Sequence, residues 1–192
     1  MNTSENLTES MRSSKLIFDG IVVHLYEDHI TLPNGRDAVR EYVKHIGAVA
    51  VLPLTENEEV LCVRQYRYPF HKVLTEIPAG KLDSADEDHV EAALRELREE
   101  TGARCEKLTY LGAYYSSPAI LDEKIDLYLA EDLSFGDVDP DEDEFIEPVR
   151  IPLSKLVDAV LAGEICDGKT QIAILKVQEI LRRRAIAAGD AT

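Results

Sequence analysis

The sequence contains little positive charge. Only 21 of its 192 residues are lysine or arginine, against 37 aspartates and glutamates, so the formal net charge is −16. This balance excludes general nucleic-acid binding, which requires a basic face. It leaves an anionic small molecule open as a ligand, because a few arginines or a metal ion create a local positive site. The basic run Arg182 to Arg184 is better explained as a helix end, where cations are favourable, than as a nucleic-acid site.

Cysteines are few, and long apolar runs are missing. Cys62, Cys105 and Cys166 form no close pair and no C-x-x-C motif, so neither a disulfide framework nor a zinc site is predicted. The first residues lack the apolar core of a signal peptide, and no apolar run reaches the roughly 20 residues that span a membrane. We therefore expect a cytoplasmic protein with no membrane partner.

The chain divides by pattern into three parts. Residues 1–13 are polar and are predicted to be a flexible N-terminus. Residues 14–44 contain short β-like runs around Pro33-Asn34-Gly35, a hairpin turn signal, and are predicted to form an N-terminal β-strand appendage. Residues 45–189 form the main domain, in which we expect strands and helices to mix in an α/β (α+β) fold.

Three features of the main domain support this fold class. The apolar run 46–54 suits a strand that is buried on both faces. The run 145–151 reads as a strand that Pro148 interrupts or places at a sheet edge. Two later segments have apolar residues at helical spacing and end at Gly163 and Gly189.

The segment from residue 90 to residue 103 holds the strongest functional signal. Val90, Ala93, Leu94 and Leu97 form an apolar helical face, and around the helix from it lie three acids, Glu96, Glu99 and Glu100. Like charges at this spacing cost about 0.2–0.5 kcal/mol per pair, and the helix dipole disfavours them near a C-terminus. A divalent cation would remove both penalties, so the acids suggest a metal site. The alternative is a solvated acidic face.

The surrounding residues resemble the Nudix box, G-x5-E-x7-R-E-U-x-E-E-x-G-U, in which U is apolar. The matching residues are Gly80, Glu87, Arg95-Glu96-Leu97, Glu99-Glu100 and Gly102-Ala103. The one departure is that six residues, rather than five, separate Gly80 from Glu87. Taking Asp86 as the acid instead would break the spacing to Arg95. We expect the extra residue to bulge the loop and leave the helical acids in place.

The resemblance implies an α/β/α sandwich with a mixed sheet and metal-dependent hydrolysis of a diphosphate bond. In that family the metal ligands correspond here to Glu96, Glu99, Glu100 and the carbonyl of Ala79. The expected metal is Mg²⁺, with Mn²⁺ as a possible substitute. Arg95 lies four residues before Glu99 and either orients it or forms an ordinary surface ion pair.

Further elements resemble the ADP-ribose pyrophosphatase branch of the family. Arg64-Gln-Tyr-Arg67 followed by Glu76-Ile-Pro-Ala-Gly80 implies that Arg67 contacts the substrate phosphates, to which a planar guanidinium is suited. Ser117-Pro118-Ala119 and Glu123 resemble a second element, although alanine replaces its usual glycine. Glu123 is thus a ribose or metal-network contact, or only a turn acid. The substrate-binding residues implied by resemblance are Arg67, Arg40, Glu41, Glu76, Pro118 and Glu123.

The acidic loop 139–145 offers a general base. In the resembled enzymes a loop after the central helix supplies a glutamate that deprotonates the attacking water, which here is Glu142 or Glu144. We favour Glu142, with Glu144 as the base or an extra metal ligand. Neighbouring acids should raise the pKa of some members of this cluster, which suits a base near neutral pH. The alternative is a solvated loop.

The sequence therefore leads to a nucleotide-sugar diphosphatase that hydrolyses ADP-ribose to AMP and ribose 5-phosphate. A second possibility is the hydrolysis of another nucleoside diphosphate sugar. A third, of another class, is a sensor that binds such a nucleotide without cleaving it, although acids at every box position favour an enzyme. The resemblance also implies a homodimer that forms through the N-terminal strands.

Overall fold

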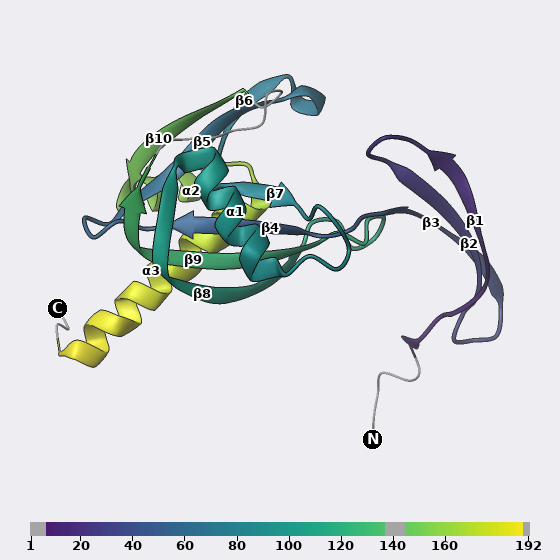
Figure 1. Ribbon diagram of the computed structural model, residues 1–192. Helices are drawn as coiled ribbons and strands as arrows, with labels where there is room; N and C mark the ends of the chain where they lie inside the picture. Colours follow the sequence, from purple (N-terminus) through teal and green to yellow (C-terminus); the bar gives the residue numbers. More distant parts are fainter. Residues whose placement is uncertain (1–6, 137–144, 190–192) are drawn as a thin grey trace. The chain divides into compact units, whose positions relative to one another are not determined.

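The structure is a computed structural model that describes residues 7–136 and 145–189 (Figure 1). Contacts divide the chain into two compact units. The first contains the chain up to Ile46 together with Tyr115–Lys124, and the second contains Gly47–Tyr114 and the chain from Ile125 onward. No local pattern indicated that residues 115–124 belong with the N-terminal strands. Across the residues described, no helix combines the length and the apolar character needed to cross a membrane.

The first unit is built on a three-stranded antiparallel sheet in the order β1-β2-β3. Its strands are β1 (Ser10–Asp19), β2 (His24–Thr31) and β3 (Asp37–Lys44). The predicted hairpin turn joins β2 to β3, and Gly35 there has a φ of 82°, which glycine adopts without a steric penalty. β1 begins inside the segment 1–13, which we predicted to be a flexible N-terminus, because Ser10 pairs with Thr31 of β2.

This first sheet has almost no core of its own. All ten residues of β1 are exposed, and Phe18 has an exposed fraction of 56%. Ile30 is the only buried apolar side chain among the residues described in this unit. A three-stranded sheet needs an apolar face covered by other residues to be stable in water. Within the described residues of this unit, the apolar side chains of β1 are therefore left without a covering layer.

The described residues of the second unit form two sheets and three α-helices. The sheets have the orders β7-β4-β9-β8 and β10-β5-β6, and β4 runs parallel to β9. The elements are β4 (Ala48–Pro53), β5 (Glu59–Arg67), a 3₁₀ turn η2 (Tyr68–Phe70), β6 (Lys72–Glu76), β7 (Ala79–Lys81), α1 (His89–Thr101), β8 (Ala103–Tyr115), β9 (Lys124–Phe135), β10 (Ile146–Pro152), α2 (Leu153–Leu161) and α3 (Gly168–Ala188). β10 is an edge strand, as Pro148 predicted.

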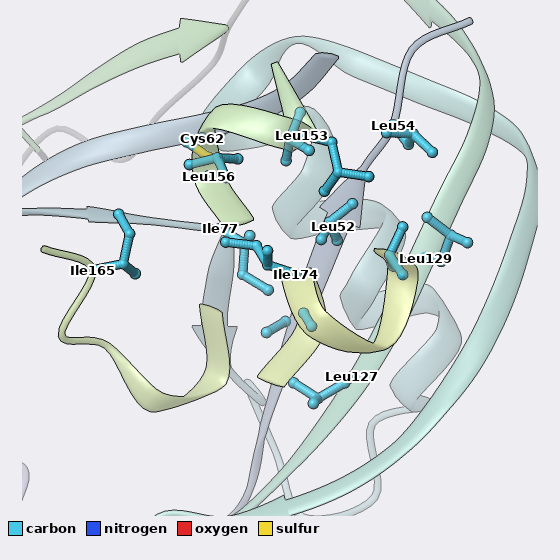
Figure 2. Packing of buried hydrophobic residues seen from close by; sticks show 14 of the residues in the cluster. Leu52, Leu54, Cys62, Ile77, Leu127, Leu129, Leu153, Leu156, Ile165 and Ile174 are labelled. Carbon is cyan, nitrogen blue, oxygen red and sulfur yellow. The ribbon is translucent and has the colours of Figure 1, made fainter. Parts of the chain in front are cut away.

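Strand β4 separates the two halves of the core. All six of its residues are buried, as its unbroken apolar run predicted. Val49 and Val51 pack toward α1, whereas Ala50 and Leu52 pack toward α2 and α3. Figure 2 shows Leu52 of this second cluster among leucines and isoleucines from β9, α2 and α3. Helices on both faces of the strands form the predicted α/β/α sandwich.

The buried face of helix α1 matches the predicted one only in part: Ala93 and Leu97 are buried as expected. Val90 is exposed and Leu94 is only partly buried. The buried side chains are Ala92, Ala93, Glu96, Leu97, Glu100 and Thr101. Positions 92, 96 and 100 follow one another at intervals of four, so they share one side of the helix. The two acids therefore lie on the packed side, beside the small alanines, and not across the helix from it.

Candidate active site

Helix α1 carries the acids at its C-terminal end. The Asp88 carboxylate begins the helix by accepting hydrogen bonds from the backbone amides of Val90 and Glu91, at 2.8 and 3.1 Å. The helix ends at Gly102, whose φ of 67° lies in the left-handed region that the sequence indicated for a C-cap. The acids thus occupy the last two turns, where the helix dipole favours a bound cation.

Strand β7 forms the surface that faces two of these acids. Glu96 and Glu100 have exposed fractions of 7% and 2%. The Glu96 carboxylate lies so close to Gly80 that a Cβ atom there would be 2.0 Å from Glu96 Oε1. The neighbouring amide of Ala79 donates to Glu100 Oε2 over 3.3 Å. The glycine of the motif is therefore needed here because it leaves space for a carboxylate.

Arg95 connects three acids. Its Nη1 donates to Glu96 Oε1 at 2.7 Å and to Glu99 Oε2 at 3.1 Å, and its Nε donates to Glu87 Oε1 at 3.3 Å. Burial lowers the pKa of the Arg95 guanidinium, but Glu96 and the other carboxylates raise this pKa by more than burial lowers it. Arg95 therefore stays charged. The spacing in the sequence indicated the contact with Glu99. The contacts with Glu87 and Glu96 needed the fold.

The loop between β7 and α1 accommodates the extra residue of the motif. Glu87 Oε2 accepts a hydrogen bond from the Asp83 amide at 2.6 Å, and the Glu87 amide donates to Ser84 at 3.2 Å. These bonds close a turn over residues 83–87, and Glu87 still reaches Arg95 from it. The hydrogen bond from Asp83 also lowers the pKa of Glu87. The structure thus supports Glu87, rather than the alternative Asp86, as the first acid of the motif.

A second charged group lies at the start of the segment that leads into β7. Glu76 is 2% exposed, and Arg67 grips both of its oxygens, with Nε to Oε1 and Nη2 to Oε2 each at 2.8 Å. Lys169 Nζ approaches Oε2 from α3 at 2.5 Å. Burial raises the pKa of Glu76, but the hydrogen bonds and charges of Arg67 and Lys169 lower it more, to about 2. Glu76 therefore carries a negative charge at neutral pH.

The sequence did not point to the α3 side of this group. Asp167 begins α3 and accepts hydrogen bonds from the Thr170 amide at 2.9 Å and from Lys169 Nζ at 3.0 Å. The Thr170 hydroxyl accepts a hydrogen bond from the amide of Ile77, next to Glu76, at 3.0 Å. The aspartate in Asp167-Gly168-Lys169-Thr170 was the only available signal, because aspartate is a favoured N-cap. Nothing local could connect it with Glu76.

Comparison with known proteins identifies the family. A family model described as the NUDIX domain matches residues 44–170. The chain belongs to the Nudix family.

Two relatives match nearly the whole length of this Nudix hydrolase. It is 42% identical to an ADP-ribose pyrophosphatase of Bacillus subtilis (strain 168), over 93% of this chain and 98% of the relative. It is 41% identical to a methanol dehydrogenase activator of Bacillus methanolicus, over 92% and 97% of the two chains. Among solved structures, a crystal structure of an ADP compounds hydrolase has a TM-score of 0.80 and covers 92% of this chain and 96% of its own, at 22% identity. That likeness confirms the Nudix fold.

The donor atoms suit the divalent metal that Nudix hydrolases generally need. Glu96, Glu99 and Glu100 offer carboxylate oxygens, which hard cations prefer, and Gly80 leaves the space in which one carboxylate lies. In residues 7–136 and 145–189, however, no three His, Cys, Asp or Glu side chains already gather into a group that could hold a metal ion. Arg95 instead supplies the positive charge between Glu96 and Glu99.

Four of the remaining predicted residues of this Nudix chain, Arg40, Glu41, Pro118 and Glu123, belong to the first unit. In the first unit, Arg40 pairs with Glu9, and Glu41 is exposed on β3. Glu123, in the same segment as Pro118, accepts a hydrogen bond from the Ser116 hydroxyl at 2.6 Å and lies 3.7 Å from His45 Nε2. The substrate contacts expected of these residues stay predictions. Glu142 and Glu144 lie outside the residues that the structure describes.

Proposed function

We propose that this Nudix hydrolase cleaves the diphosphate bond of ADP-ribose, giving AMP and ribose 5-phosphate. The observation that carries the proposal is the way Arg67 is held. Its guanidinium is fixed on the buried carboxylate of Glu76 while 38% of its side chain stays exposed. The hydrogen bond to Glu76 is the main cause that raises the pKa of Arg67, and the charge of Glu100 on α1 adds to it. The 42% identity to an ADP-ribose pyrophosphatase supports the same substrate.

Arg67 is suited to bind a phosphate group in this position. Glu76 occupies its Nε and one hydrogen of Nη2, so the Nη1 side of the fork is not used by that carboxylate. A guanidinium donates to phosphate oxygens in a fixed plane, and its charge does not depend on pH in the physiological range. Arg67 thus orients the diphosphate and offsets the charge on its oxygens.

We propose that Glu96, Glu99, Glu100 and the Ala79 carbonyl hold Mg²⁺, for which Mn²⁺ can substitute. A cation held there would offset charge on the diphosphate, polarise phosphorus and make the attacking water more acidic. The chain's own acids supply the oxygen ligands, and Arg95 keeps Glu96 and Glu99 close to one another. Hydrolysis then joins the water oxygen to phosphorus, breaks the bond from phosphorus to the bridging oxygen and passes one water proton to a base.

We propose Glu142 as this base, with Glu144 as the alternative. Replacing the true base by glutamine is expected to lower kcat by about 10²–10⁴-fold, because an amide cannot accept the water proton. The acidic limb of the pH–rate profile should disappear in that variant alone. Steady-state rates of Glu142→Gln and Glu144→Gln from pH 5 to pH 9 make the comparison. Wild-type profiles for both variants would place the base elsewhere.

A panel of diphosphates tests the proposed substrate. The enzyme is incubated with Mg²⁺ and ADP-ribose, UDP-glucose, GDP-mannose or a diadenosine polyphosphate, and alkaline phosphatase then releases phosphate only from cleaved products with terminal phosphates. We expect the highest kcat/KM for ADP-ribose. A higher value for another nucleoside diphosphate sugar would reassign the substrate. Tight binding of ADP-ribose without any turnover would favour the sensor and end the enzyme proposal.

We also propose that the protein is a homodimer in which a second copy covers the first unit. The exposed apolar side chains of β1 and the near absence of a core in that unit support a partner surface. Sedimentation of the chain should give the mass of two 21.5 kDa copies. Phe18→Asp, which places a charge among these side chains, should shift the equilibrium toward the monomer, whereas Lys15→Asp serves as the control. A monomeric wild type at micromolar concentration would contradict the proposal.

A further inference from the structure

Lys169 occupies an unusual position for a lysine. It is 8% exposed, and its ammonium lies 2.5 Å from Glu76 Oε2 and 3.0 Å from Asp167 Oδ1. Burying an ammonium is costly unless it is paired and hydrogen-bonded, and both conditions are met here. Lys169, in the first turn of α3, thus places a buried ammonium beside the Oε2 atom of Glu76.

Two cations share the carboxylate of Glu76 unequally. Arg67 binds both oxygens and is 38% exposed, whereas Lys169 binds Oε2 alone and has only 10% of its side chain exposed. Arg67 is therefore the partner that can meet a ligand, and Lys169 is the partner that cannot. When Arg67 shares its charge with a phosphate, Lys169 remains beside Glu76 as its counterion. The buried carboxylate then keeps both its charge and its place.

The same turn of α3 also holds the backbone that follows Glu76. Thr170 is fully buried, and its hydroxyl donates to Asp167 Oδ2 at 2.5 Å while accepting from the Ile77 amide at 3.0 Å. Asp167 in turn pairs with Lys169. Side chain and backbone of the Glu76–Ile77 segment are thereby fixed to one helical turn, two residues before Ala79.

We propose that Lys169 is a positioning residue for Arg67, acting through the carboxylate that they share. Without the Lys169 ammonium, Arg67 is the only cation among the described residues that is bonded to Glu76. The guanidinium cannot serve the buried carboxylate and a phosphate equally well. This inference rests on the proposed function, and specifically on Arg67 as a ligand of the substrate diphosphate. Lys169 itself touches no substrate atom.

Steady-state kinetics of Lys169→Met with ADP-ribose test the proposal. We expect KM to rise about tenfold or more, the effect of weakening one charged hydrogen bond, with kcat changed by less than about threefold. Lys169→Arg keeps a cation and should restore most of the affinity. Lys176→Met is the matched control, because Lys176 lies on the same helix but donates to the Leu111 carbonyl. The KM of the Lys176→Met variant should equal that of the wild type. A purely structural role would instead lower kcat and the melting temperature and leave KM unchanged.

A double-mutant cycle identifies the route through Arg67. In an Arg67→Ala background, Lys169→Met should raise KM no further, because the residue it positions is gone. Additive effects would overturn the proposal. If Lys169→Met alone does not fold, Glu76→Gln/Lys169→Met removes both charges together, and its KM should equal that of Glu76→Gln. A higher KM in that double variant would equally overturn it.

The two proposals fail in different ways. A wild type that does not turn over ADP-ribose contradicts the proposed function, whatever the variants do. A wild type that turns it over, alongside a Lys169→Met variant with an unchanged KM, contradicts the role of Lys169 alone.

Discussion

Glu100→Gln is expected to lower kcat at least about 100-fold, since a metal ligand contributes several kcal/mol of transition-state stabilisation. Glu100 is 2% exposed and points toward β7, where it accepts a hydrogen bond from Ala79. A glutamine has the same shape, and its amide oxygen can accept that bond, so the fold should persist. What it lacks is the negative charge that a divalent cation requires. Turnover of ADP-ribose over a range of Mg²⁺ concentrations measures the loss, and far-UV circular dichroism measures the fold.

Glu91→Gln is the matched control for this change. Glu91 lies on the same helix, but it is exposed and in the first turn, away from β7. Its neutralisation should leave both kcat and the dependence on Mg²⁺ at wild-type values. Near-wild-type activity of Glu100→Gln would remove Glu100 from the metal site.

Gly80→Ala is expected to reduce kcat by about 100-fold with only a small loss of stability. The new Cβ would lie 2.0 Å from Glu96 Oε1, so this carboxylate must move. It is the free end of a side chain, and Gly80 is not among the residues with positive φ, so neither the helix nor the strand has to break. The displaced oxygen is, however, one of the proposed metal ligands. Measured on the same preparation, kcat should therefore fall strongly while the melting temperature changes little.

Gly163→Ala provides the opposite pattern. Gly163 has a φ of 76° and nothing within 4 Å of an added Cβ, so alanine strains the backbone there but meets no catalytic side chain. Stability should fall by about 1 kcal/mol while kcat stays unchanged. If Gly80→Ala behaved like this control, the Glu96 carboxylate would not be the group that requires glycine at position 80.

The sequence pattern correctly predicted those parts of the fold that depend on interactions between residues close together in the sequence. The unbroken apolar run of β4 indicated burial on both faces, and Pro148 indicated an edge strand. The glycine after α1 indicated a left-handed cap, and that cap fixed the acids in the last turns. In each case the outcome depends on the side chains of a few adjacent residues and on the intrinsic preferences of proline and glycine.

The predictions that failed, and the contacts that were missed, depended on distant parts of the chain. Helical spacing could not tell which side of α1 meets β7, and the acids proved to lie on the buried side with Ala92 and Ala93. One of the two cations that pair with Glu76 is Lys169, 93 residues further along the chain. Residues 115–124 join the first unit through pairings such as Val43 with Leu121. No local propensity encodes such pairings, since they arise only when the core assembles.

The hydrogen bond between Ile77 and Thr170 bears on the stage of synthesis at which the protein can become active. The two residues are 93 positions apart, so the contact must wait until nearly the whole second unit has been made. The acids of α1 and the arginine of β5 leave the ribosome much earlier. A nascent chain that ends before α3 thus holds all the charged groups of the α1 site but lacks the lysine and the threonine that fix Glu76 and Ile77. Activity should therefore arise late, with the folding of the last helix.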